Sequence, residues 1–285
     1  MERGWLRQPA EKRLIMPGKV YIVGAGPGAA DLLTLRAVKA LRVAQVVLHD
    51  DLVPPEILDL CPASAQVINV GKRCGHRGRS QEQINALMVW HAREPQVQTI
   101  VRLKSGDPAV FGRLGEELDA LRRAGIEFEI VPGVTAASAA AASAKITLTD
   151  RRAASALVVV TAHNCRNASL SETVVEPARS TYALYMPGPD YSKTVQGLLE
   201  SGQELATPCA VVSNAGRANE EVRYLTLQEL ASAKGISAPA VLIVGEVARH
   251  IQQQTSFDLA MLDGTSHLID GSDPGLPAGR ISLQP

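Results

Sequence analysis

Short apolar runs alternate with helical patterns through the first half of the chain, and this alternation constrains the fold most. Five runs have the length of buried strands: Lys19–Val23, Gln45–His49, Gln66–Val70, Gln98–Leu103 and Glu127–Val131. The segments between them place apolar residues at helical spacing, over Asp31–Val43, Pro55–Leu60, Gln81–Arg93 and Leu114–Ala124. Such β-α-β alternation predicts a mostly parallel sheet that is covered by helices.

The pattern changes after Pro132 and Gly133, where we place a domain boundary. A helix of small residues is expected over 134–144. Further strands are expected at Ala156–Thr161, Thr181–Met186, Cys209–Ser213 and Ala240–Val244, with helices near 192–201 and 226–233. We predict a disordered tail at 1–17 and a flexible tail at 256–285.

Composition excludes several classes of function. The chain of 285 residues carries 29 Lys and Arg against 29 Asp and Glu, so it has no overall basic field for nucleic acid. Its apolar runs are far shorter than the roughly 20 residues of a membrane helix, and the N-terminus has no apolar signal segment. The cysteines form no CxxC pair and the histidines have no metal spacing, which indicates reduced thiols in a cytosol and no metal site.

A glycine-rich stretch, Gly24–Gly28, follows the first expected strand directly. Glycines there permit positive φ angles and let a ligand approach the backbone, although a tight β-α turn needs them too. With Ala29 the stretch also satisfies the loose dinucleotide pattern G-x-G-x-x-A, and Asp50 ends the second strand where a ribose-binding acid would lie. An NAD-dependent oxidoreductase therefore remains an alternative, although Pro27 removes one N–H from such a phosphate cradle.

Three further loops follow expected strands. Ser105–Arg113 contains an Asp-Pro turn, Gly71–Arg79 carries four cations, and Val131–Ala137 leads into the small-residue helix with Thr135 near its start. Each has a structural alternative: a simple turn, a solvated basic loop, or close helix packing. Because the carboxyl ends of parallel strands form the ligand crevice of such sheets, we predict a shared site that includes an anion-binding part.

In order and spacing, these stretches resemble the tetrapyrrole methylase family, whose members use S-adenosylmethionine. The resemblance covers about residues 18–250 and rests on VGAGPGAADLLTLRAVKAL, VGKR, RLKSGDPAVFGRLGEEL, AGIEFEIVPGVTAASAAAA, LYM, VSNAG and PAVLIVGEV. It implies two α/β domains, at 18–132 and 133–255, with the cofactor in a cleft between them. A cytoplasmic homodimer without nucleic-acid or membrane partners is expected.

The resemblance is strongest to members that methylate uroporphyrinogen III at C-2 and C-7, yielding precorrin-2 and two S-adenosylhomocysteines for sirohaem and cobalamin biosynthesis. A related precorrin methyltransferase is the alternative within the family. The implied cofactor-binding residues are Pro27, Ser105, Gly106, Asp107, Val110, Thr135, Ala136, Met186, Gly216 and Ala240. Asp50 matches the family's proposed proton acceptor and Lys72 its proposed donor. Arg113, Arg73 and Arg151 are candidates for binding the substrate's eight carboxylates through charge-assisted hydrogen bonds.

This chain departs from the family pattern at several positions, and one of them is Pro187, which follows Met186 where the family usually has glycine. Ser105 stands where the family usually has glycine, which adds a side chain beside the cofactor. Asp51 and Asp150 replace basic residues near the expected substrate side, which should weaken the binding of a polyanion unless other cations compensate. A protein that keeps the cofactor pocket but has lost catalysis is therefore a third alternative.

Overall fold

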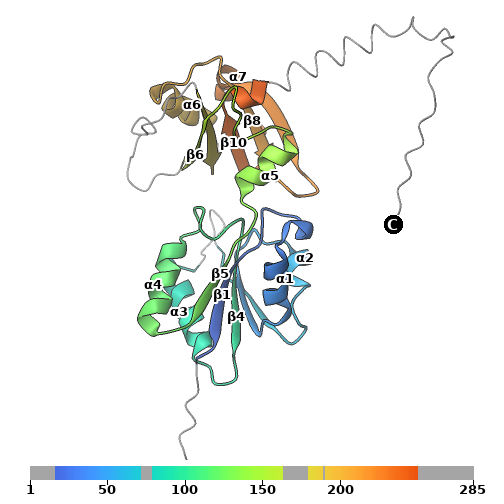
Figure 1. The fold of residues 1–285 in the computed structure, drawn as a ribbon, viewed down its shortest axis with the longest axis vertical. Helices are drawn as coiled ribbons and strands as arrows, with labels where there is room; N and C mark the ends of the chain where they lie inside the picture. The colour runs from blue at the N-terminus through green and yellow to red at the C-terminus, as the bar shows by residue number, and fades with distance from the viewer. Residues whose placement is uncertain (1–16, 72–78, 163–178, 189, 250–285) are drawn as a thin grey trace, which may run out of the picture.

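The first half of the chain builds a parallel sheet (Figure 1). The computed structural model describes residues 17–71, 79–162, 179–188 and 190–249. The strands of this sheet are β1 (Lys19–Gly24), β2 (Val46–His49), β3 (Gln66–Asn69), β4 (Thr99–Lys104) and β5 (Phe128–Val131). Their spatial order is β3-β2-β4-β1-β5, and every pair is parallel, which confirms the prediction.

Helices cover both faces of this sheet. They are α1 (Leu35–Arg42), α2 (Pro55–Leu58), α3 (Gln81–Ala92) and α4 (Leu114–Ala124). In Figure 1, α1 and α2 lie on one side of the sheet, and α3 and α4 lie on the other. Strand β2 is buried along its whole length because it meets both helical layers.

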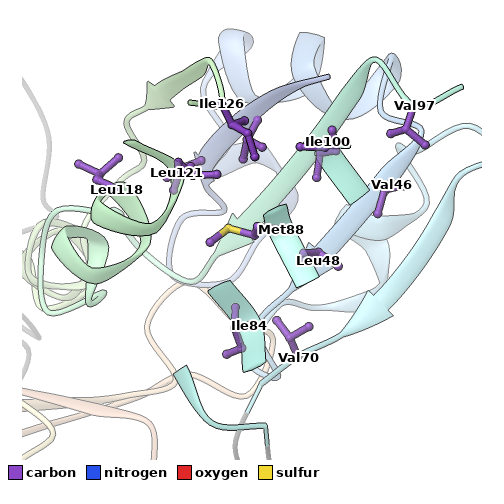
Figure 2. Packing of buried hydrophobic residues seen from close by; sticks show 13 residues of the cluster. Val46, Leu48, Val70, Ile84, Met88, Val97, Ile100, Leu118, Leu121 and Ile126 are labelled. Carbon is purple, nitrogen blue, oxygen red and sulfur yellow. The ribbon is translucent and has the colours of Figure 1, made fainter. Parts of the chain in front are cut away.

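Side chains on β2 alternate between the two apolar cores. Val46 and Leu48 join the cluster under α3 and α4, whereas Val47 joins the cluster under α1 and α2. Figure 2 shows the first cluster, in which Met88 of α3 and Leu121 of α4 are fully buried. Complete burial of such a side chain stabilises the fold by about 1.5–3 kcal/mol, so these layers hold the strand ends in place.

The second half of the chain builds a mixed sheet. Its strands are β6 (Ala156–Thr161), β7 (Ser180–Tyr185), β8 (Pro208–Ser213), β9 (Glu221–Thr226) and β10 (Ala240–Val244), in the order β6-β7-β10-β8-β9. Only β6 and β7 pair in parallel. The helices are α5 (Ala136–Ser143), α6 (Tyr191–Glu200), α7 (Leu227–Ala231) and the short 3-10 turn η4 (Glu246–Ala248). The alanines of α5 let it pack closely against one face.

Two local predictions were wrong. The sequence pattern missed β9, a half-exposed edge strand whose alternation of Val222 and Tyr224 with charged residues is a period-2 signal. The helix expected over Asp31–Val43 is split into a 3-10 turn, η1 (Ala30–Leu32), and α1, which begins at Leu35. The reason for the later start is Thr34, whose hydroxyl accepts a hydrogen bond from the N–H of Ala37 and caps α1.

The change from the first sheet to the second falls between Val131 and Ala136. A domain division at 132/133 therefore stays our proposal. The predicted tails, apart from Pro17 at the edge of one range, lie outside the described residues. Within the described ranges, no helix combines the length and the apolar character that a membrane span requires.

Candidate active site

Three strand ends of the first sheet pack backbone against backbone. Gly24 ends β1, Gly106 follows β4 and Gly133 follows β5. Gly26 and Gly106 exchange two backbone hydrogen bonds, with N···O distances of 3.2 and 2.7 Å. A Cβ atom on Gly133 would lie 2.3 Å from the Gly106 carbonyl oxygen and 2.8 Å from the Gly24 Cα, so only glycine permits this approach.

Asp107 ties two of these loops together. Its Oδ1 accepts a hydrogen bond from the Ala109 N–H at 2.8 Å, and its Oδ2 accepts one from the Gly133 N–H at 2.9 Å. The carboxylate therefore fixes the loop after β4 to the loop after β5. Each carboxylate oxygen can accept a second hydrogen bond, so the expected contact with a ligand remains open to it.

The glycine-rich loop also touches the second half of the chain. The N–H of Ala29 donates to the Gly216 carbonyl oxygen at 2.5 Å. A Cβ atom on Gly28 would lie 2.5 Å from that oxygen and 2.6 Å from the Cγ of Arg217. Arg217 in turn donates from Nη2 to the Leu52 carbonyl oxygen at 2.6 Å. The loop after β8 therefore packs against the loops after β1 and β2.

Tyr185, at the end of β7, makes a second connection near the same place. Its hydroxyl accepts a hydrogen bond from the Ala137 N–H at 2.9 Å and also hydrogen-bonds the hydroxyl of Thr135. Tyr185 thus takes the capping role that Thr135, the first residue before α5, leaves open. The Tyr185 ring also lies 5.1 Å from the ring of Phe111, which belongs to the loop after β4.

A cavity of about 440 Å³ lies between these connections and is lined by both halves of the chain. That volume is in the range of small-molecule sites. The cavity wall brings together most of the residues that the sequence predicted for the cofactor and for proton transfer: Pro27, Asp50, Ser105, Gly106, Asp107, Val110, Thr135, Ala136, Met186 and Ala240. Gly216 is not in the wall, but it supports Pro27 and Ala29 from behind.

Asp50 reaches the cavity with its carboxylate held at both oxygens. Oδ1 accepts a hydrogen bond from Nη2 of Arg102 at 2.5 Å, and Oδ2 accepts one from the Ser105 N–H at 3.2 Å. The Asp50 side chain is 29% exposed, so it is accessible from the cavity while its orientation is fixed. The Ser105 hydroxyl oxygen is buried and has no hydrogen-bond partner among the described residues.

The predicted cations are less closely grouped. Lys72 and Arg73 lie outside the described residues, so their positions stay predictions. Arg113 is half-exposed, has a left-handed backbone conformation and forms a bidentate pair with Glu116 at 2.7 and 2.6 Å, outside the cavity wall. Arg151 is exposed in a turn, also outside that wall.

Sequence reasoning missed other residues of the wall, including Tyr185 and Arg217. The LYM stretch holds a signal for Tyr185, because an aromatic residue with a polar tip at a strand end typically has a hydrogen-bond partner when it is buried. For Arg217 the sequence offers no local signal, since its partner Leu52 is 165 residues away.

The glycine-rich loop does not build the dinucleotide cradle of the alternative interpretation. It leads into η1, and α1 begins only after Thr34, which already caps it. Gly28 faces the backbone of Gly216 instead of leaving space for a pyrophosphate. A Rossmann cradle needs the helix N-terminus directly behind the glycines, so this geometry speaks against the NAD-dependent alternative.

Comparison with known proteins gives a consistent answer. Residues 19–231 match the family of Tetrapyrrole (Corrin/Porphyrin) Methylases. The chain belongs to the tetrapyrrole methylase family. Over 84% of its length this tetrapyrrole methylase is 44% identical to the uroporphyrinogen-III C-methyltransferase of Pseudomonas aeruginosa, covering 98% of that protein. It is also 41% identical to the sirohaem synthase of Zymomonas mobilis, of which it spans about half the length, 51%.

Solved structures of tetrapyrrole methylases are similar as well. The uroporphyrin-III C-methyltransferase of Thermus thermophilus, complexed with S-adenosylhomocysteine, superposes with a TM-score of 0.71 at 36% identity. The match covers 81% of this chain and 99% of that one. A cobalt-precorrin-4 methyltransferase reaches the same TM-score at 30% identity, over 81% of this chain and 95% of the other.

The contact between Gly28 and Gly216 makes a testable prediction. Gly28→Ala would push the loop after β8 away from the loop after β1, because the new methyl group would overlap the Gly216 carbonyl. Overpacking of this kind costs about 1–3 kcal/mol. If the whole cost falls on the closed cavity, the affinity should drop about 5- to 150-fold. Isothermal titration with S-adenosylhomocysteine measures this loss in affinity. An affinity equal to that of wild type would contradict a close contact between Gly28 and Gly216 beside the cofactor cavity.

Proposed function

We propose that this protein is an S-adenosylmethionine-dependent C-methyltransferase that converts uroporphyrinogen III into precorrin-2 by methylation at C-2 and C-7. The observation that carries the proposal is the cavity of about 440 Å³ between the two halves. It occurs in a chain that is 36% identical to a methyltransferase structure containing S-adenosylhomocysteine. Relatives with 44% and 43% identity, from Pseudomonas aeruginosa and Paracoccus denitrificans, bear the name uroporphyrinogen-III C-methyltransferase.

The cavity has the chemical character that the methyl donor requires. Val110, Met186 and Val241 provide apolar wall, while backbone groups after β4 and before α5 provide polar contacts. The buried hydroxyl of Ser105 has no hydrogen-bond partner within the described part of the chain, and a bound ligand with polar groups can supply one. When it is bound, S-adenosylmethionine would supply a methyl group on a positively charged sulfur, and the neutral thioether that remains is a good leaving group.

The chain's own contribution to the reaction is alignment and proton removal. Holding the donor and a pyrrole carbon in line supplies up to roughly 7–11 kcal/mol of the barrier in favourable cases. As the new carbon–carbon bond forms, the bond from the methyl group to sulfur breaks, and a proton must then leave the methylated ring system. Asp50 accepts that proton, because its carboxylate reaches the cavity and is held by Arg102 and Ser105.

The cations predicted from the sequence would hold the substrate's carboxylates. Arg113 is available for this role, because its ion pair with Glu116 is half-exposed on both sides and exposed pairs contribute about 0–1 kcal/mol. A substrate carboxylate can therefore compete with Glu116. Arg151, Lys72 and Arg73 are the further candidates. Asp51 lies in the cavity wall and opposes the binding of a polyanion, while Arg217 in the same wall offsets its charge.

We also propose that the protein is a cytoplasmic homodimer and that its product feeds sirohaem or cobalamin synthesis. The sirohaem synthase relatives support the first pathway, and the cobalt-precorrin-4 methyltransferase structure supports a place near the second. Size-exclusion chromatography with light scattering tests the dimer, for which we expect twice the mass of 30.3 kDa. A monomer at micromolar concentration would contradict it.

Incubation with uroporphyrinogen III and S-adenosylmethionine under anaerobic conditions tests the proposed function. We expect a product heavier than the substrate by two methyl groups, with two S-adenosylhomocysteines formed for each substrate molecule consumed. Binding of S-adenosylhomocysteine without methylation of uroporphyrinogen III would contradict the substrate assignment. Parallel incubation with precorrin-2 then separates a precorrin methyltransferase from a protein that has lost catalysis.

A further inference from the structure

We infer that Arg102 is the positioning residue for the Asp50 carboxylate, and that Glu117 holds Arg102 in the orientation this requires. The inference rests on the proposed function, in which Asp50 accepts a proton. Arg102 is not in the cavity wall, so it acts on the reaction only through Asp50. Arg102, Lys104 and Glu117 lie within the stretch RLKSGDPAVFGRLGEEL, but the sequence alone does not predict that they form a buried group.

All three nitrogen atoms of the Arg102 guanidinium donate hydrogen bonds. Nη2 donates to Oδ1 of Asp50 at 2.5 Å, and Nε donates to Oε1 of Glu117 at 2.9 Å. Nη1 donates to the carbonyl oxygens of Leu48 at 3.3 Å and Leu103 at 3.1 Å. These acceptors come from β2, from the residue that follows it, from β4 and from α4, so the planar fork links three elements in one orientation.

Burial makes this network rigid. The side chain of Arg102 is 3% exposed and that of Glu117 is 0% exposed. Lys104, at the end of β4, brings its Nζ to 3.0 Å from the Glu117 carboxylate. The two cations and Glu117 are buried and Asp50 is partly buried, so the four groups balance one another in charge, which is the condition under which buried charges are tolerated.

The directions of the pKa shifts agree with this arrangement. Burial works against the charge of Arg102, but the carboxylates of Asp50 and Glu117 outweigh it and raise the pKa of Arg102 above its ordinary value. For Lys104, burial and then the charge of Arg102 lower the pKa below its ordinary value, although Glu117 partly restores it. Arg102 is thus the firmly charged member of the group that faces Asp50.

The geometry also explains why an arginine is needed. Asp50 is held from the β4 side by two donors, Nη2 of Arg102 at one oxygen and the Ser105 N–H at the other. A lysine carries a single ammonium group on a flexible stem and lacks the planar fork that spans Asp50 and Glu117 at fixed angles. Arg102→Lys therefore keeps the positive charge but no longer fixes the orientation of the Asp50 carboxylate.

A double-mutant cycle of Arg102→Lys and Asp50→Asn tests the inference in the full-length protein. We expect Arg102→Lys to lower kcat about 10- to 100-fold, since small misplacements of a reacting group have effects of this size. The KM for uroporphyrinogen III and the Kd for S-adenosylhomocysteine should stay within about twofold of wild type. In the Asp50→Asn background, Arg102→Lys should change kcat by less than about threefold, because its effect passes through Asp50.

Additive effects of the two substitutions on kcat would overturn the inference, as would an effect on KM or cofactor affinity alone. Arg122→Lys is the matched control, since Arg122 carries an exposed ion pair with Asp119 on α4, and it should behave as wild type. If Arg102→Lys does not fold, Glu117→Gln replaces it in the same cycle, because it loosens Arg102 while keeping the side-chain shape.

A crystal structure of Arg102→Lys, or of Glu117→Gln, tests the positioning independently of activity. We expect the Asp50 carboxylate to be turned from its wild-type orientation or to occupy several orientations. An Asp50 carboxylate in the wild-type position would overturn the inference. If wild-type protein yields no methylated product, the proposed function fails, and this structural result still decides whether Arg102 positions Asp50.

Discussion

Asp50→Asn should lower kcat for methylation of uroporphyrinogen III by about 10²- to 10⁴-fold, the usual contribution of a positioned general base. The amide has nearly the shape of the carboxylate, and its oxygen can still accept the hydrogen bond from Arg102. Only the longer bond from the Ser105 N–H is lost, because the amide NH2 group cannot accept it, so the cavity should keep its form. The affinity for S-adenosylhomocysteine should therefore be unchanged. Initial rates under anaerobic conditions and isothermal titration measure the two quantities.

Asp59→Asn is the matched control for this substitution. Asp59 is exposed at the end of α2 and is not in the cavity wall, so its variant should keep wild-type rates. Undiminished turnover of Asp50→Asn, with normal cofactor binding, would rule out Asp50 as the proton acceptor. A loss of cofactor affinity equal to the loss in rate would assign Asp50 a binding role instead.

Gly133→Ala should destabilise the fold and weaken cofactor binding together. Its new Cβ would lie 2.3 Å from the Gly106 carbonyl oxygen, and backbone atoms cannot move aside as a flexible side chain can. Overpacking of this kind costs about 1–3 kcal/mol, and we expect the free energy of unfolding to fall by that amount. The loops after β1, β4 and β5 would separate, so the affinity for S-adenosylhomocysteine should fall at least tenfold.

Gly115→Ala is the control that the chain offers for this prediction. Gly115 lies in α4, and a Cβ there would meet nothing within 4 Å. Replacing glycine by alanine in a helix stabilises by up to about 1 kcal/mol, so this variant should be as stable as wild type or more stable. Chemical denaturation measures both variants, and equal stability of Gly133→Ala and wild type would contradict the close backbone packing.

The arrangement of the first sheet could be predicted from local patterns. Val46, Val47 and Leu48 form an unbroken apolar run because β2 is covered on both faces, and such a run indicates a strand within a parallel sheet. Placement of the loops follows from the same logic, since parallel strands bring their carboxyl ends to one edge. That Asp50 and Gly106 lie near each other in the cavity wall could therefore be predicted, but the distances between their atoms could not.

Contacts between the two halves could not be predicted in this way. The hydrogen bond from Arg217 to the Leu52 carbonyl joins residues that are 165 positions apart, and neither residue carries a pattern that names the other. The network of Arg102 and Glu117 was missed for a different reason. Charged residues are usually exposed, and only the packing of α4 on β4 places these two side chains at 3% and 0% exposure.

A crystal structure of the protein with S-adenosylhomocysteine tests the central claim most directly. The account predicts that the ligand lies in the cavity between the two sheets, in contact with the loop at Gly106 and with Met186, and that its sulfur faces the side of the cavity where Asp50 lies. A ligand bound at any other place on the molecule, or a sulfur directed away from Asp50, would contradict it.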